Sequence, residues 1–360
     1  MLLIILERLG TFNYQPQFAK ALTFINEKIC SGESVFQSVV EISLHTERFP
    51  EGHVYPRGTV FMQESITVPG EIRSDTSTDT LDISDRKKFR KLCLPKGVAV
   101  YNGLNCWPYF FDPYKKLLET FGVPFTEVDD QALRDGLLNQ CELLIVPGGP
   151  DAGESYYAGL GDKGLENIRR FVREGGSYIG SCAGAYFPLQ GDKTLPESRM
   201  LLGIVPARDI NGMDFTQRGT GLIRLELSPE GPGALFSLSY GSYRSVDVIY
   251  WEGPVFSCEE KSVRVLARFQ TLLTTAIDWN RWQPKNSIAA DAIAYGNPLP
   301  KEVFDIQMRN MPAAIEADYG KGRLHLYAFH PEFGAPTAES WETSLPLLFI
   351  MNSIYDLASR

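Results

Sequence analysis

Apolar runs and amphipathic stretches alternate between residues 97 and 187, and this alternation predicts the fold of that part of the chain. Short apolar runs predict strands, and apolar residues at helical spacing predict the helices between them. The expected strands are Gly97–Gly103, Pro124–Asp129, Glu142–Pro150 and Ser177–Phe187, and the expected helices are Asp112–Gly122, Gln131–Gln140 and Gly164–Gly176. Strands that alternate with helices of this length are joined by right-handed crossovers. We therefore expect an α/β fold with a doubly wound, mostly parallel sheet.

The pattern becomes richer in strands after Leu201. Segments with strand character occur at Gly221–Leu227, Asp247–Trp251, Ser262–Phe269, Ala313–Tyr319 and Arg323–Phe329. The last two flank a GKG turn, so we expect them to pair as an antiparallel hairpin. A closing apolar stretch predicts a helix around Trp341–Leu357.

The first part of the chain, residues 1–92, has a different character from residues 93–360, which we assign to one main domain. Apolar residues at helical spacing predict a helix over Phe18–Cys30. The stretch Glu71–Lys91 is rich in Ser, Thr and Asp and poor in large apolar residues, which predicts a polar linker. We interpret residues 1–92 as a structural extension with its linker, and a docking or regulatory extension is the alternative.

Composition and charge exclude several classes of protein. The 360 residues, of which 22% are charged and 12% aromatic, can bury a full core without disulfide or metal staples. With 35 Lys+Arg against 44 Asp+Glu, the net charge of −9 argues against a nucleic-acid or anionic-membrane partner. The terminal apolar runs are too short for a signal peptide or a bilayer span, so we expect a cytoplasmic protein.

The six cysteines are widely spaced and form no CxxC pair, and the four histidines show no zinc-ligand spacing. We therefore expect reduced thiols, no metal and no cofactor.

One cysteine stands in a motif that can carry chemistry. The sequence GSCAG at Gly180–Gly184 follows a predicted strand and is the thiol counterpart of a nucleophile elbow. Such a sharp turn needs small flanking residues, and it places Cys182 near the N-terminus of the next helix, where a thiolate is favoured. The backbone N–H of Ala183 can then stabilise an oxyanion. The alternative is a buried structural cysteine in a tight turn.

Two further motifs follow predicted strands. PGGP at Pro147–Pro150 has two glycines that let the backbone approach a ligand and point N–H groups toward it. FHPEF at Phe329–Phe333 offers His330 as a base for the cysteine and Glu332 as the acceptor that orients it. His325, which alternates with leucines along the same strand, is expected to be a packed or solvated strand residue.

At these motifs the chain resembles class I glutamine amidotransferase-like domains, and most closely the N-terminal domain of biotin–protein ligases. The resemblance covers about Gly97 to Leu357 and rests on Tyr101–Gly103, Pro147–Gly149, Tyr178–Phe187 and Tyr319–Phe333. It implies a flavodoxin-like sheet with a β-rich insertion between Leu201 and Pro312.

The same resemblance implies roles for individual residues. Cys182 would be the nucleophile, His330 the base and Glu332 the residue that orients it. The oxyanion hole would consist of the backbone amides of Gly148 or Gly149 and of Ala183. The side chains of Asn102 and Tyr186 would bind the substrate.

Two hypotheses for function stay open. The first is a cysteine amidohydrolase that forms a thioester on the carboxamide of a small molecule. The second is a catalytically silent module that binds a metabolite or a protein partner. Tyr186 favours the second, because glutaminases of this family usually carry Gln at that position. The chain has no GRGR-type adenylate loop, so we do not expect it to ligate biotin by itself.

Overall fold

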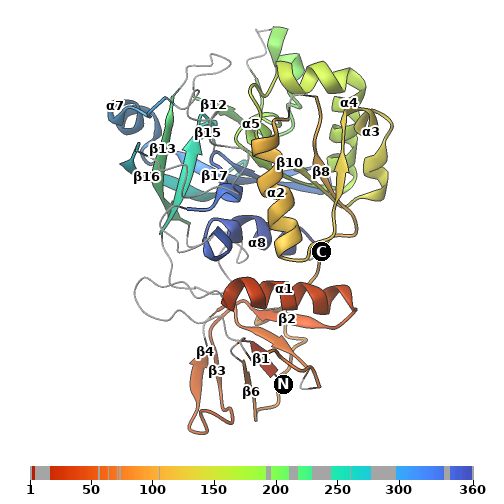
Figure 1. Ribbon diagram of the computed structural model, residues 1–360, viewed down its shortest axis with the longest axis vertical. Helices are drawn as coiled ribbons and strands as arrows, with labels where there is room; N and C mark the ends of the chain where they lie inside the picture. Colours follow the sequence, from red (N-terminus) through yellow and green to blue (C-terminus); the bar gives the residue numbers. More distant parts are fainter. Residues whose placement is uncertain are drawn as a thin grey trace.

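The computed structural model describes residues 2–4, 17–55, 57–63, 65–70, 72, 74–104, 106–191, 196–210, 218–228, 245–259, 261–276, 297–335 and 341–358. Over these residues the main feature is a nine-stranded sheet in the order β14-β13-β16-β17-β18-β11-β10-β8-β9 (Figure 1). Its strands are β8 (Val98–Tyr101), β9 (Thr126–Val128), β10 (Leu143–Val146), β11 (Ser177–Ser181), β13 (Thr220–Leu227), β14 (Ser245–Trp251), β16 (Arg264–Thr274), β17 (Pro312–Tyr319) and β18 (Gly322–Tyr327).

The sheet has a parallel half and an antiparallel half. Neighbouring strands from β9 to β18 run parallel, so their carboxyl ends meet at one edge of the sheet. From β18 to β14 every pair is antiparallel, and β17 and β18 form the expected hairpin, with Tyr319 opposite Gly322. The predicted α/β class is therefore confirmed. The β-rich stretch after Leu201 extends the same sheet through β13, β14 and β16, while β12 (Ala207–Asp209) and β15 (Phe256–Cys258) pair separately.

Helices cover both faces of the parallel half. The helical segments are α2 (Pro108–Thr120), α3 (Asp130–Arg134), η1 (Leu137–Gln140), α4 (Glu154–Glu174), α5 (Ala183–Tyr186), η2 (Pro196–Met200), α7 (Lys301–Val303), the π-turn η4 (Phe304–Met308), η5 (Pro331–Phe333), η6 (Trp341–Thr343) and α8 (Leu347–Ala358). The direction of the crossovers places α3 and α4 on one face, with α2 and α8 on the other (Figure 1). Among the described helices, none combines the length and the apolar character needed to cross a bilayer.

Glycines explain where two predicted helices differ from the observed ones. The expected helix Gln131–Gln140 is divided into α3 and η1 at Gly136, whose φ of 85° lies in the left-handed region. α4 begins at Glu154, ten residues earlier than expected, and bends at Gly161, whose φ is 55°. In both cases glycine adopts a backbone conformation that other residues rarely take, so helical periodicity alone misplaces the boundary.

The N-terminal residues form a second, five-stranded sheet in the order β6-β1-β5-β2-β7 and the predicted helix α1 (Gln17–Cys30). The strands, with the separate β3–β4 pair, are β1 (Leu2–Ile4), β2 (Val35–Ser38), β3 (Ile42–Leu44), β4 (His53–Tyr55), β5 (Val60–Met62), β6 (Ser74–Thr76) and β7 (Phe89–Leu92). The stretch expected as a linker thus contributes β6 and β7. Polar residues there bond inside the fold: buried Asp75 accepts hydrogen bonds from Thr46 Oγ1 (2.7 Å) and Tyr55 OH (2.8 Å).

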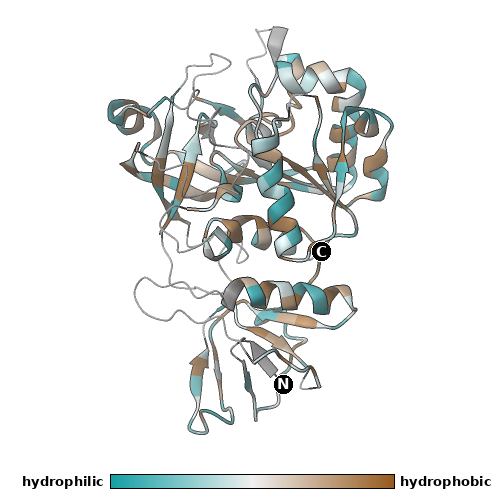
Figure 2. Ribbon diagram, in the orientation of Figure 1, coloured by the Kyte–Doolittle hydropathy of each residue, from teal (hydrophilic) through white to brown (hydrophobic). Residues whose placement is uncertain are grey.

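The N-terminal sheet is joined to the main sheet through α1 and α8. Asn26 Nδ2 of α1 donates to the carbonyl of Phe121 (2.6 Å), and Tyr355 OH of α8 donates to Asn26 Oδ1. Arg90 of β7 lies 3.5 Å from Asp356 near the end of α8. α8 is strongly apolar and lies between the main sheet and α1 (Figure 2). Because α1 covers it, every residue from 347 to 355 is buried.

Candidate functional site

The GSCAG turn has the geometry of a nucleophile elbow. Cys182 follows β11 with φ 51° and ψ −118°, a conformation that non-glycine residues rarely adopt. A Cβ on Gly180 would lie 2.2 Å from the carbonyl oxygen of Gly184, and a Cβ on Gly184 would lie 2.0 Å from that of Val146. Glycine at both positions is therefore a steric requirement of the turn, as the sequence predicts.

The motif after β18 brings a histidine and a carboxylate to the same edge of the sheet. His330 Nδ1 lies 2.7 Å from Glu332 Oε1, which lies on η5. His330 N–H also donates to the carbonyl of Ile249 (2.9 Å), which ties the backbone to β14. The exposed fractions are 5% for Cys182 and 0% for His330 and Glu332. The three residues thus form a buried cluster.

The PGG turn lies against both Cys182 and His330. A Cβ placed on Gly148 would be 3.0 Å from His330 Cε1 and 3.3 Å from Cys182 Cβ. Both side chains therefore pack around this one glycine. His330 Nε2 makes no hydrogen bond of normal geometry with any described residue, although the ring is close enough to Cys182 for a strong electrostatic interaction.

Electrostatics favour the protonated form of His330. Burial lowers the pKa of His330, but the facing Cys182 and the bonded Glu332 outweigh burial and raise that pKa from 6.5 to about 10. A protonated His330 beside Cys182 would stabilise a thiolate. The expected helix contribution is smaller than the sequence suggested, because α5 is only four residues long and carries little dipole.

Aromatic residues that sequence reasoning missed enclose the histidine. The ring of His330 stacks on Phe110 (centroids 5.0 Å apart, 9° between planes) and on Phe333 (4.4 Å, 12°), and these two rings also stack on each other (6.1 Å). The Cys182 thiol donates to the carbonyl of Trp251 (3.4 Å), whose ring also packs on Phe110. The run WPYFF at Trp107–Phe111, directly after a strand and its loop, is the sequence signal that could have indicated this wall.

The remaining predicted site residues lie at different distances from the cluster. Ala183 is the first residue of α5, where a helix leaves its N–H without an intrahelical partner, and Gly149 follows Gly148 on the loop after β10. Asn102 follows β8, two strands from β11, and its backbone N–H donates to Val128. Among the described residues, no hydrogen bond or ring contact joins Asn102 to the cysteine, the histidine or the glutamate.

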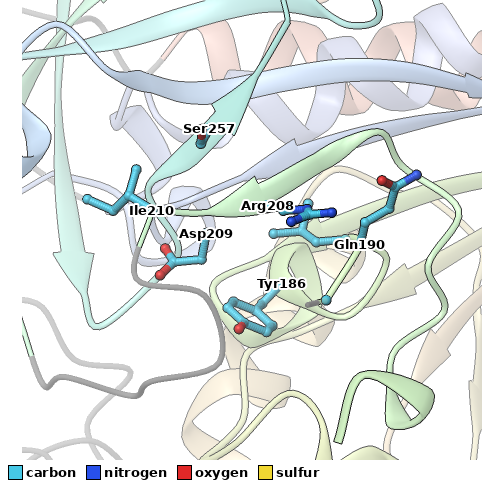
Figure 3. Close-up of a pocket in the computed structure, with 8 residues that line it drawn as sticks. Tyr186, Gln190, Arg208, Asp209, Ile210 and Ser257 are labelled. Carbon is cyan, nitrogen blue, oxygen red and sulfur yellow. The ribbon is translucent and has the colours of Figure 1, made fainter. Parts of the chain in front are cut away.

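Tyr186 lies on α5, one turn after Cys182, and lines a cavity of about 230 Å³ (Figure 3). The other lining residues are Leu189, Gln190, Gly191, Arg208, Asp209, Ile210 and Ser257. Asp209 is buried and pairs with Arg218 (2.6 Å), while its other oxygen accepts from the N–H of Val255 (2.7 Å). Burial, with the charges of Asp209 and Asp151, raises the pKa of Tyr186, so its hydroxyl stays protonated at neutral pH.

A second cluster lies away from this site. Glu316, His325 and Asp356 place one nitrogen or oxygen each within 4.8 Å of one another. Positive charge is already present there, because Arg323 pairs with Asp356 (2.9 Å) and Arg264 with Glu316 (3.1 Å). The donor set could hold a cation, but these arginines oppose one, and we assign it no metal. His325 is fully buried, in agreement with the packed alternative.

The chain matches the family described as "Biotin-protein ligase, N terminal" over residues 115–347. The chain is 35% identical over 96 residues to an uncharacterized protein of Chlamydia muridarum (strain MoPn / Nigg), covering 25% of this chain and 36% of that one. It is 26% identical over 200 residues to the biotin–protein ligase of Schizosaccharomyces pombe (strain 972 / ATCC 24843), covering 54% and 26%. The chain therefore spans about a third or less of the length of these curated relatives.

The solved structures that match part of the chain include glutamine amidotransferases. One crystal structure of a glutamine amidotransferase matches 73% of this chain and 99% of its own, at 19% identity and a TM-score of 0.41. Another, from Thermotoga maritima, matches 67% of this chain and 78% of its own, at 16% identity and a TM-score of 0.37.

Proposed function

The chain belongs to the biotin-protein ligase N-terminal family, and from this premise we propose that it is a cysteine-dependent amidohydrolase acting on the carboxamide of a small molecule. The observation that supports this most is the conformation of Cys182. A cysteine held at φ 51°, beside a histidine that is bonded to a buried glutamate, has the parts of an activated nucleophile. A purely structural cysteine requires none of these features.

The proposed chemistry proceeds in two halves through a thioester. The Cys182 thiolate attacks the carboxamide carbon, and the oxyanion that forms accepts hydrogen bonds from the amides of Gly148 or Gly149 and of Ala183. The C–N bond breaks as His330 gives its proton to the departing ammonia. Water, deprotonated by His330, then attacks the thioester, releases the acid and restores the thiol. In total, one amide and one water give one acid and one ammonia.

A place for the rest of the substrate is the cavity beside Tyr186. It lies one helical turn from the nucleophile and carries hydroxyl, amide and guanidinium groups, from Tyr186, Ser257, Gln190 and Arg208. At the position on α5 where glutaminases usually carry a Gln that helps to bind glutamine, this chain has the hydroxyl of Tyr186. We therefore propose a carboxamide other than glutamine as the substrate.

A silent binding module on the same scaffold is the second candidate. The burial of Cys182, which is 5% exposed, favours it, because a substrate must reach the sulfur.

The thiols of the protein itself separate the two candidates. The protein is treated with iodoacetamide and, separately, with an electrophilic glutamine analogue, and the modified cysteines are mapped by mass spectrometry. Cys106 is a matched internal control, since it is 7% exposed and burial raises its pKa to about 12. The amidohydrolase predicts that iodoacetamide modifies Cys182 much faster than Cys106, and that His330→Gln removes the difference.

Each outcome decides between the candidates. Equal, slow modification of both cysteines contradicts the amidohydrolase and supports the binding module. Fast modification by iodoacetamide without modification by the glutamine analogue supports a hydrolase for another amide. Fast modification by both reagents contradicts our exclusion of glutamine.

A further inference from the structure

A chain of buried hydroxyl groups leads to the carboxylate of Glu332 from the side opposite His330. Tyr114 OH, on α2, donates to Ser181 Oγ at the end of β11 (3.0 Å). Ser181 Oγ donates in turn to Glu332 Oε1 (3.4 Å), the oxygen that also bonds His330 Nδ1. All three side chains are fully buried. Ser181 and His330 therefore bond the same oxygen of Glu332, and Tyr114 is linked to that oxygen through Ser181.

The order of donors in this chain is fixed by hydrogen-bond chemistry. A serine hydroxyl has one hydrogen to donate, and it can accept at its lone pairs. Burial and the charge of Glu332 raise the pKa of Tyr114 well above its usual value, so Tyr114 remains a donor throughout the working pH range. Because Ser181 accepts from Tyr114, its own hydrogen is directed to Glu332.

Glu332 has few other partners that could hold its charge. Its Oε2 is buried and makes no hydrogen bond to any described residue. The neighbouring Trp341 Nε1 donates to the backbone carbonyl of Glu332 (3.0 Å) and leaves the carboxylate untouched. A buried carboxylate needs donors to remain ionised. Apart from the imidazole, Ser181 is the one described side chain that provides such a donor.

We propose that Ser181 and Tyr114 are positioning residues that hold the Glu332 carboxylate oriented toward His330, and so set the basicity of the histidine that faces Cys182. The proposal rests on the function proposed above. The titratable groups that face this carboxylate are His330 on one side and Tyr114 on the other, and Cys182 lies beyond the imidazole. Neither positioning residue touches the reacting atoms.

The test is the pH profile of Cys182 alkylation by iodoacetamide, followed by mass spectrometry in the full-length protein. In Ser181→Ala, Glu332 loses a donor to a charged group, so we expect the apparent pKa of Cys182 to rise by about one unit. Tyr114→Phe, which removes a single hydroxyl, should shift the profile in the same direction by a smaller amount. Tyr355→Phe is the matched control, because it also removes one buried tyrosine hydroxyl, and that hydroxyl bonds Asn26 and not Ser181 or Glu332.

The outcomes distinguish this proposal from the proposed function. A slow Cys182 in the unchanged protein argues against the hydrolase, yet its apparent pKa and the shifts can still be measured. A fast Cys182 whose profile is the same in all variants overturns the positioning role alone. A shift in Tyr355→Phe equal to that in Tyr114→Phe would show a general loss of stability and would also overturn it. If Ser181→Ala does not fold, Tyr114→Phe decides.

Discussion

Two buried histidines, five residues apart in the sequence, lie in the same part of the fold and differ in how their ring nitrogens are bonded. His325 on β18 and His330 just after it are both fully buried, and each bonds a glutamate. Both ring nitrogens of His325 are occupied, Nδ1 by Ser353 Oγ (2.7 Å) and Nε2 by Glu316 Oε2 (3.1 Å). His330 uses only Nδ1 in this way, and its other nitrogen faces the region of Cys182.

The difference shows that a buried histidine–carboxylate pair is not in itself a functional sign. Around His325 the nearest hydroxyl belongs to Ser353, which lies within α8 and is also bonded by Tyr327. Arginines neutralise the carboxylates there. At His330 the nearest nucleophile is a cysteine in a strained turn beside a glycine. Under the proposed function, the ring nitrogen that faces Cys182 is therefore the feature that distinguishes His330 from the packed His325.

Exchange of each histidine for glutamine should separate the two roles, and the largest effect is expected at His330. His330→Gln removes the imidazolium, so alkylation of Cys182 at neutral pH should slow by about 100-fold or more. His325→Gln should leave that rate nearly unchanged. Rates are followed by mass spectrometry of the Cys182 peptide, and equal losses in both variants would contradict the comparison.

Stability should respond in the opposite way. His325→Ala removes a fully buried ring together with its hydrogen bonds to Glu316 and Ser353 and leaves a cavity, so we expect a loss of about 3 kcal/mol in the free energy of unfolding. His45→Ala is the control, because His45 also pairs with an aspartate but its side chain is 56% exposed. Urea denaturation measures the free energy of unfolding of both variants. A loss in His45→Ala as large as that in His325→Ala would contradict the prediction.

The pH dependence of stability should report the proton on His330. Since its pKa is raised from 6.5 to about 10 in the folded protein, the folded state binds that proton more tightly than the unfolded chain. The stabilisation is complete below about pH 6.5 and is lost as the pH rises to about 10. The difference in Tm between the unchanged protein and His330→Gln should therefore narrow as the pH rises. A constant difference would indicate that the ring is neutral.

A smaller effect is expected from Gly148→Ala, which adds one methyl group next to His330. The new Cβ would lie 3.0 Å from His330 Cε1 and 3.2 Å from Phe110 Cδ1, so the ring must move by a few tenths of an ångström. We expect alkylation of Cys182 to slow by about tenfold. Gly70→Ala is the matched control, because a Cβ there meets nothing within 4 Å.

Local sterics made much of the fold predictable from the sequence. The strands β8, β10 and β11 are short apolar runs that end in glycine turns, and the structure has them within the predicted ranges. The GSCAG turn could also be predicted, because a side chain at either glycine would collide with backbone atoms close in sequence or on the adjacent strand. Helix boundaries at Gly136 and Gly161 were missed, since periodicity does not report the sign of φ.

The surroundings of the site depend on contacts between distant parts of the chain. The imidazole of His330 stacks on Phe110 of α2 and on Phe333, and Ser181 bonds Glu332, which is 151 residues away in the sequence. No local pattern encodes such pairings. The HPE motif distinguishes His330 from His325 in the sequence, but the partners of each ring, Ser353 of α8 and Phe110 of α2, follow from packing between distant segments.

The backbone of Cys182 has a consequence for how the protein tolerates mutation. At φ 51° any side chain is strained, and glycine is the residue that this conformation suits. Cys182→Gly should therefore fold with a free energy of unfolding raised by about 1 kcal/mol, even though it removes the thiol. The sulfur is thus held at this turn at a cost in stability that glycine would not carry.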